Sequence, residues 1–169
     1  MYIRPINKVF IPIPKCATGT LKWELKKRYR KEHHDIRPWE GTPDDPEAFV
    51  VMWRDPIDRF ESAWNFLART TEARRAPWLD HTFQQFCDKV LAEGFDDIHT
   101  RPQSDYEVPG REMIRIPWDF EAFAAEFDLE LPLHRRNHHE RCAAGWTRDL
   151  LMRFERRYER DLEIWGRMD

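Results

Sequence analysis

The 169-residue sequence has few of the features that mark several large classes of protein. Its three cysteines, Cys16, Cys87 and Cys142, are odd in number and widely spaced, which argues against the disulfide framework of a small secreted domain. No apolar run approaches the ~20 residues that a helix needs to cross a bilayer. The N-terminal segment also lacks the continuous apolar stretch and the small-residue cleavage site of a signal peptide. We therefore expect a cytoplasmic protein without a transmembrane segment.

An excess of positive charge is also missing. Lys and Arg number 28 against 31 Asp and Glu, so the formal net charge is −3 at pH 7. Domains that bind duplex nucleic acid usually have a basic balance or a basic stripe, so we expect no nucleic-acid partner. The dense basic residues between 22 and 31 still allow a local pocket for a smaller anionic ligand.

Hydrophobic residues are numerous enough for one sizeable core. They make up 41% of the chain, and its 8 Trp and 11 Phe residues can bury large areas. The chain has no internal repeat, low-complexity tract or linker to a second domain. Its length fits one domain, and we expect a single domain over residues 1–169.

Strand and helix patterns alternate along the chain. The N-terminal segment reads as a first strand that ends in the buried run 8–13 (KVFIPI), and a helix with one apolar stripe is expected over 18–31. Residues 49–53 (FVVMW) form a second buried-strand pattern, and Asp55 followed by Pro56 is typical of a helix start. This alternation predicts an α/β fold with a parallel sheet flanked by helices.

Weaker patterns follow in the second half of the chain. Phe-rich residues 83–91 predict a helix that Gly94 ends. Residues 113–116 are expected to form a strand and 120–127 a short helix. The apolar residues spaced along 151–165 predict one amphipathic helix at the end.

The loop between the first strand and the first helix has the composition of an anion-binding turn. A loop that runs straight from a buried strand into a helix directs several backbone N–H groups to one point, which attracts phosphate or sulfate. Gly19 would let the backbone approach a ligand closely. A generic strand–turn–helix with an exposed lysine is the alternative. The candidate binding residues are Lys15, which adds a mobile positive charge, and Cys16, Ala17, Thr18, Gly19 and Thr20.

This loop differs from the phosphate-binding loop of nucleoside triphosphatases. In GxxxxGK[ST] the Lys follows the second Gly and precedes a Ser or Thr that binds magnesium, whereas Lys15 here precedes Gly19. The sequence therefore predicts a phosphate cradle without the usual metal ligand. We expect no metal site elsewhere, because the histidines and the cysteine between 134 and 142 have no common zinc-site spacing.

Arg54 stands at the carboxyl end of the second predicted strand, where ligands bind in open parallel sheets. An arginine in this place can make a bidentate contact with a phosphate. Ser62 lies seven residues, or nearly two helical turns, after Asp55. It is therefore on the same side of the helix as the helix start. Arg54 and Ser62 could bind one anion together. In the alternative interpretation Arg54 pairs with Asp55 or Asp58, and Ser62 is solvated.

Together these segments resemble the sulfotransferases that use 3′-phosphoadenosine 5′-phosphosulfate (PAPS). The match is closest to the branch with carbohydrate sulfotransferases and short bacterial relatives. Residues 14–20 (PKCATGT) are similar to the family loop PKxxxT[ST], and residues 54–62 are similar to the family segment that begins with R[DN]P and ends in Ser. Weaker similarities, to the HxxPQ segment, a Glu-containing segment and the YxxD helix, lie at residues 99–106, 114–127 and 158–165.

The resemblance implies a parallel α/β fold related to nucleotide kinases, with a phosphate loop similar to theirs. It implies PAPS as the donor, PAP as the product and no required metal. Lys15 and the loop amides would hold the 5′-phosphosulfate, and Arg54 with Ser62 would recognise the 3′-phosphate. The acceptor that the resemblance implies is a hydroxyl group on a carbohydrate or a small metabolite.

A hydroxyl acceptor needs a general base. The candidates are His34 and His99, with His33 beside the first, because the unperturbed pKa of histidine, about 6.5, suits proton transfer. The family often has a His or a carboxylate after the first helix, where His34 stands. In the alternative interpretation His33 and His34 form a solvated turn, and His99 orients its loop.

Two other classes of function stay open. A small nucleotide-dependent, kinase-like enzyme would bind ATP–magnesium, and the missing GK[ST] pattern argues against it. A non-catalytic module that binds PAP or another polyanion would use the same loops without turnover. The sequence leaves the oligomeric state open.

Overall fold

The computed structural model describes residues 1–29, 36–37, 45–68, 81–130 and 143–168. The chain divides into two compact units, each with its own hydrophobic core. The single domain expected over the whole chain stays a prediction. The first unit consists of Met1–Arg54 and Tyr106–His138, and the second of Asp55–Asp105 and His139–Asp169.

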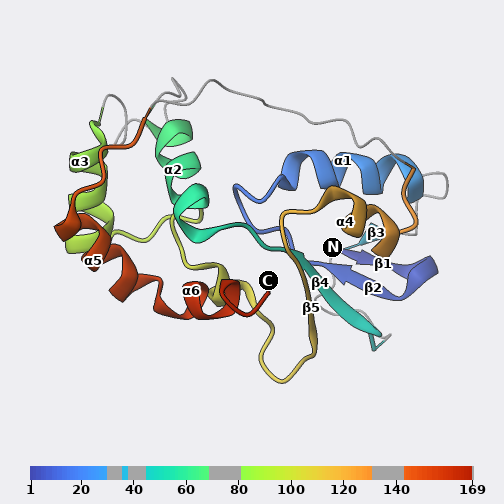
Figure 1. Ribbon diagram of the computed structural model, residues 1–169. Coiled ribbons are helices and arrows are strands. Elements are labelled where there is room, and N and C mark those ends of the chain that lie inside the picture. The colour runs from blue at the N-terminus through green and yellow to red at the C-terminus, as the bar shows by residue number, and fades with distance from the viewer. Residues whose placement is uncertain (30–35, 38–44, 69–80, 131–142, 169) are drawn as a thin grey trace. The chain divides into compact units, whose positions relative to one another are not determined.

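The first unit is built on a five-stranded sheet with the strand order β3-β1-β2-β4-β5 (Figure 1). Three neighbouring strands, β2 (Lys8–Phe10), β4 (Ala48–Met52) and β5 (Met113–Ile116), run parallel. Every residue of β4 is buried, which is typical of a central strand in a parallel sheet. The predicted α/β class, with parallel strands and flanking helices, is therefore confirmed for this part of the chain.

Two short antiparallel strands extend the sheet beyond the predicted parallel part. β1 (Tyr2–Ile3) pairs with β2 on one side and with β3 (Ile36–Arg37) on the other. A 3-10 turn at Arg4–Ile6 and the left-handed residue Asn7, with a φ of 49°, reverse the chain between β1 and β2. Asn tolerates this conformation better than most residues do. The single first strand that the sequence pattern predicts is thus two strands.

Helices α1 (Thr18–Tyr29) and α4 (Phe120–Glu126) lie on one face of this sheet (Figure 1). Phe123 of α4 packs edge-on against Phe10 of β2, with ring centroids 5.3 Å apart. Sheet and helices therefore share one core. The apolar stripe that the sequence predicts for α1 is buried in it: Leu21, Leu25 and Tyr29.

The described part of the second unit is helical. Asp55 caps α2, because its side chain accepts a hydrogen bond from the amide of Asp58 at 2.8 Å, and Pro56 is the first helical residue, as predicted. Gly94, with a φ of 68°, follows the π-helical segment at the point where the sequence predicts a helix end. The elements are α2 (Pro56–Leu67), α3 (Phe83–Cys87), a π-helical segment (Asp88–Ala92), a 3-10 turn (Gln103–Tyr106), α5 (Arg148–Arg157) and α6 (Glu159–Trp165).

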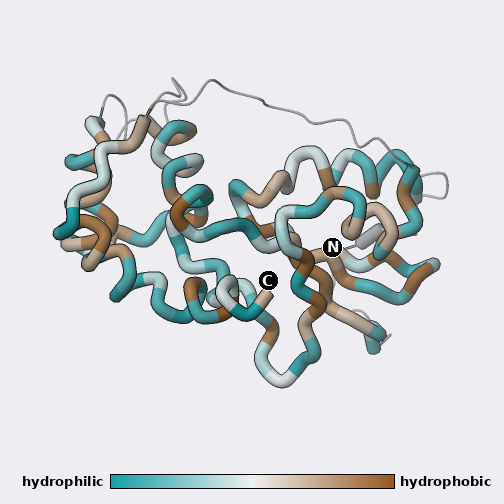
Figure 2. The backbone as a smooth tube through the Cα atoms, viewed as in Figure 1, coloured by the Kyte–Doolittle hydropathy of each residue, from teal (hydrophilic) through white to brown (hydrophobic). Residues whose placement is uncertain are grey.

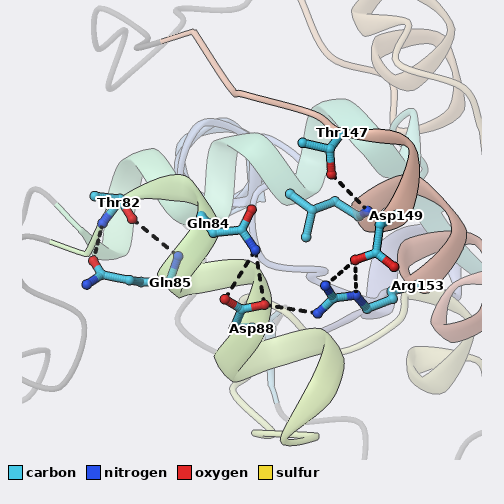
Figure 3. Close-up of polar contacts among 8 residues, drawn as sticks. Thr82, Gln84, Gln85, Asp88, Thr147, Asp149 and Arg153 are labelled. Carbon is cyan, nitrogen blue, oxygen red and sulfur yellow. Dashed lines mark hydrogen bonds and ion pairs between the residues drawn. The ribbon is translucent and has the colours of Figure 1, made fainter.

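Polar side chains hold the ends of these helices together (Figure 3). Thr82 and Gln85 form a capping box at the start of α3, in which each side chain accepts a hydrogen bond from the backbone amide of the other residue. Arg153 of α5 donates to Asp88 at 2.9 Å. This ion pair joins α5 to the π-helical segment.

The end of the chain differs from its prediction. The pattern over 151–165 predicts one helix, whereas the structure has two, α5 and α6, that are separated at Tyr158. Tyr158 has a φ of −111°, which lies outside the helical range. Phe154 and Tyr158 are buried as expected, but α6 also buries Asp161. The pattern of apolar residues predicts only the apolar side chains of this buried face.

Hydrophobic and hydrophilic residues alternate along the helices (Figure 2), as expected for helices that bury one face. In the second unit, the ring of Phe60 lies at the centre of the buried faces, with its centroid 5.1 Å from that of Phe86 and 5.3 Å from that of Phe154. Among the described residues, no helix is long and apolar enough to span a membrane.

Candidate anion-binding site

Three segments follow the carboxyl ends of the parallel strands in the first unit. A turn at residues 14–17 follows β2, Arg54 follows β4, and Trp118 follows β5. Because these strands are parallel neighbours, the three segments lie at the same edge of the sheet. Ligands of open parallel sheets bind at this edge, so a binding site is expected here.

The turn after β2 has an unusual backbone. Lys15 has a φ of 69° and Ala17 a φ of 52°, in the left-handed region that residues with a Cβ atom rarely adopt. Cys16, between them, is not among the residues with positive φ. Such alternation in the sign of φ turns successive N–H groups to one side, which is typical of an anion-binding nest. The left-handed positions are thus Lys15 and Ala17, whereas Gly19 lies in the first turn of α1.

Hydrogen bonds hold this turn in place. The amide of Cys16 donates to the carbonyl oxygen of Ile13 at 3.2 Å, and the hydroxyl of Thr18 donates to the same oxygen. The amide of Leu21 donates to the carbonyl of Ala17 at 3.0 Å, which is the first i→i−4 bond of α1. The hydroxyl of Thr18, one of the candidate binding residues, therefore donates to the loop itself.

The first turn of α1 adds further N–H groups to the site. Thr18, Gly19 and Thr20 form this turn, and the N–H groups at a helix start point toward the loop that precedes it. The helix dipole adds partial positive charge at the same end. Cys16 and Thr20 are buried and Lys15 is half-buried. The start of α1 and the Lys15 ammonium thus supply positive charge beside this turn.

Arg54 is packed beside this turn and is only 4% exposed. Its Nη1 donates a hydrogen bond to the carbonyl oxygen of Lys15 at 3.1 Å. Its guanidinium carbon lies 4.6 Å from the centroid of the Trp118 ring, within the range of a cation–π contact. Because a guanidinium is always charged in proteins, Arg54 places a permanent cation next to the loop.

The predicted site residues fall in different parts of the structure. Residues 15–20 and Arg54 come together within the first unit. Ser62 is half-buried in α2 of the second unit. His34 lies outside the described residues. The roles assigned to these residues in binding a donor stay predictions.

His99 lies just before the 3-10 turn of the second unit. Its Nδ1 is 2.8 Å from Oδ1 of Asp97, and this oxygen also accepts the backbone amide of His99 at 2.8 Å. The ring packs against Phe66, with centroids 5.0 Å apart, and the side chain is 18% exposed. A neutral ring whose Nδ1–H faces the carboxylate has Nε2 available to accept a proton.

The loop after His99 is anchored to the C-terminal helices. Asp161 of α6 accepts the backbone amide of Gln103 at 2.6 Å and that of Ser104 at 2.8 Å. The hydroxyl of Tyr158 donates to the carbonyl of Thr100. Burial raises the pKa of Asp161, and the two amide hydrogen bonds oppose that rise. The segments similar to HxxPQ and YxxD are therefore bonded to each other.

Asp97, Trp118 and the contact that Asp161 makes are not among the features that the sequence motifs predict. Asp97 could have been found as a carboxylate two residues before a candidate base. Trp118 could have been noticed because it follows a predicted strand, as Arg54 does. For Asp161 the signal was a carboxylate within an otherwise apolar stripe.

Neither a metal-binding group among the described residues nor a similar known protein gives further information about this site. Within the described ranges, no group of three or more His, Cys, Asp or Glu side chains is placed to hold a metal ion. The histidines and the cysteine between 134 and 142 lie outside those ranges. No family model, no curated protein and no solved structure matches the chain.

Proposed function

We propose that this protein is a sulfotransferase that moves a sulfuryl group from PAPS to a hydroxyl group of a carbohydrate or a small metabolite. The observation that carries the proposal is the turn before α1, where φ alternates in sign at the start of a helix and Arg54 bonds to the backbone. These groups suit a ligand with clustered negative charge, such as a phosphosulfate. The similarity of residues 14–20 and 54–62 to the sulfotransferase segments supports PAPS as that ligand.

The proposed reaction forms one bond and breaks one. The acceptor oxygen bonds to sulfur while the bond between sulfur and the bridging oxygen of the 5′-phosphosulfate breaks. The electron pair stays on that oxygen, so negative charge grows on the leaving PAP, as it does in phosphoryl transfer. The loop amides and the Lys15 ammonium would stabilise this charge. The acceptor proton goes to a general base.

We assign recognition of the 3′-phosphate to Arg54 and Ser62. A guanidinium has five N–H donors in a planar fork, and Nη1 of Arg54 bonds to the carbonyl oxygen of Lys15. Arg54 would therefore shape the loop as well as bind the donor. Arg54→Ala is expected mainly to weaken donor binding.

We assign the role of general base to His99, with His34 as the alternative. The support for His99 is its pairing with Asp97 at 2.8 Å. A carboxylate that orients the imidazole through Nδ1 is a common arrangement for a base that activates a hydroxyl. The loop bonds to Asp161 and Tyr158 hold the following residues in place.

Calorimetric titration with PAP, with AMP and ATP–magnesium as controls, tests the proposal. Clear binding of PAP and much weaker binding of AMP would support a site that reads a 3′-phosphate. A preference for ATP–magnesium would contradict it and favour the kinase-like enzyme. Tight PAP binding without turnover on any hydroxyl acceptor would favour the non-catalytic module.

Two arginine variants sharpen this titration. Arg54→Ala should weaken PAP binding. Arg28→Ala is a matched control, because Arg28 lies on α1, is half exposed and pairs with Asp128 at 2.6 Å, away from the loop. Equal PAP affinities in the two variants would contradict the role of Arg54 in donor binding.

A further inference from the structure

Trp118 is partly exposed, and its ring also contacts two other side chains of the first unit. It follows β5, and 36% of the residue is exposed. One neighbour of its ring is the guanidinium of Arg54, at 4.6 Å from the ring centroid. Another is Phe120, which packs edge-on with centroids 5.6 Å apart. A large ring is thus held at the edge of the sheet where the candidate site lies.

The cation–π contact with Trp118 is favourable for a buried arginine. Arg54 is 4% exposed, so its charge has lost most of its contact with water. The face of an indole ring attracts a cation and leaves the edges of a planar guanidinium able to form hydrogen bonds. The Nη1 edge bonds to the carbonyl oxygen of Lys15. Trp118 therefore contacts the loop through Arg54.

The backbone of Lys15, whose carbonyl oxygen accepts the hydrogen bond from Arg54, is strained. Lys15 has a φ of 69°, a conformation that a residue with a Cβ atom keeps only when its surroundings hold it there. The hydrogen bond from Arg54 to its carbonyl is one such restraint. The orientation of that carbonyl also sets the direction of the next amide, that of Cys16, because both belong to one peptide plane.

We propose that Trp118 is a positioning residue for the anion-binding turn. It holds the guanidinium of Arg54 by its ring face, and Arg54 holds the carbonyl of Lys15. The indole thus sets the geometry of the loop without touching the anion. The consequence for PAP rests on the proposed function, whereas the consequence for the Lys15 carbonyl does not.

Three variants test this role. Trp118→Leu removes the aromatic face, and Trp118→Phe keeps a smaller one. Trp23→Leu is the matched control, because Trp23 of α1 also carries a cation over its ring, Lys27 at 5.4 Å. It tests the loss of a cation–π pair in the same unit but on another element.

The first measurement is the NMR shift of the Lys15 carbonyl carbon, which responds to the hydrogen bond from Arg54. We expect this resonance to move upfield in Trp118→Leu, to move much less in Trp118→Phe, and to stay in place in Trp23→Leu. The second is the affinity for PAP. We expect Trp118→Leu to weaken it about fivefold to thirtyfold, which is the size of a desolvated cation–π contact, with most of the loss restored in Trp118→Phe.

The outcomes separate this inference from the proposed function. An unchanged Lys15 carbonyl in a folded Trp118→Leu variant would overturn the positioning role. So would an equal change in Trp118→Phe, or the same change in Trp23→Leu. If wild type fails to bind PAP while the carbonyl shifts as expected, the proposed function fails and the positioning role stands.

Discussion

Nη1 of Arg54 donates a hydrogen bond to the carbonyl oxygen of Lys15 across 3.1 Å. The two residues stand 39 positions apart and follow different parallel strands. Separate sequence patterns indicate the two segments: Lys15 belongs to a predicted phosphate loop, and Arg54 stands at the end of a predicted strand. Because of this hydrogen bond, a substitution in one segment should alter the structure of the other.

Lys15→Ala should abolish sulfuryl transfer. The ammonium would stabilise charge on the leaving oxygen, and the loss of one such contact typically lowers kcat by about a hundredfold or more. Steady-state kinetics with PAPS measures the change. Lys26→Ala, at an exposed position of α1, is the control and should keep its activity. An unchanged kcat in Lys15→Ala would falsify the mechanism.

Ala17→Gly should stabilise the protein by about 1 kcal/mol, because Ala17 has a φ of 52° and glycine adopts this conformation without strain. Urea unfolding measures the free energy of unfolding. Ala122→Gly is the matched control, at an exposed position in α4. It should destabilise by about 0.5–1 kcal/mol. A loss of stability in both variants would mean that the backbone at Ala17 is not strained.

His99→Ala should lower kcat by about a hundredfold or more if His99 is the general base, while PAP binding stays unchanged. Asp97→Ala should lower kcat by less, because it removes the partner 2.8 Å from Nδ1 but leaves the ring. Its matched control is Asp96→Ala, since Asp96 is exposed and pairs with Arg101. His34→Ala is measured alongside. Wild-type turnover in His99→Ala, with a loss in His34→Ala, would move the base to His34.

Asp161→Asn should destabilise the protein by about 1–3 kcal/mol. Both carboxylate oxygens accept backbone amides, from Gln103 at 2.6 Å and from Ser104 at 2.8 Å. An amide side chain has one oxygen, so one buried N–H would face another donor. Asp105→Asn, at an exposed position nearby, should change little. Equal unfolding midpoints in urea for the two variants would contradict the anchoring role of Asp161.

Cys87 should be inert to thiol reagents in the native protein, because burial raises the pKa of its thiol from the ordinary value of 9.0 to about 12. In a Cys142→Ser background we expect neither Cys16 nor Cys87 to react at about pH 8, and both to react in denaturant. Rapid modification of Cys16 or Cys87 in the folded protein would contradict this expectation.

The same pKa shift gives a pH dependence of stability. Between pH 9.0 and about 12 the thiol of Cys87 ionises in the unfolded chain but stays protonated in the folded one. The folded state then binds more protons, so the free energy of unfolding falls as pH rises through this window. Cys87→Ala should show a shallower fall than wild type, and equal slopes would contradict the shift.

Local signals explain what the sequence predicts well. The Asp55-Pro56 start of α2, the buried stripe of α1 and the left-handed Gly94 each depend on a few neighbouring residues, and the structure confirms them. The parallel strands β2, β4 and β5 follow from short apolar runs separated by helices. The same signals locate the turn at residues 14–17 and the strand end at Arg54.

Contacts between distant residues were decided by the tertiary structure alone. The stack of Trp118 on Arg54 joins residues 64 positions apart in the sequence, and no local pattern marks it. The same holds for the bonds from Asp161 to a loop 57 and 58 positions away. Lys15 and Ala17, two residues with a Cβ atom, take the left-handed conformation although Gly19 stands close by. Sequence propensity determines which segments become strands, turns and helices, whereas strain and buried charge are settled only when packing brings their partners together.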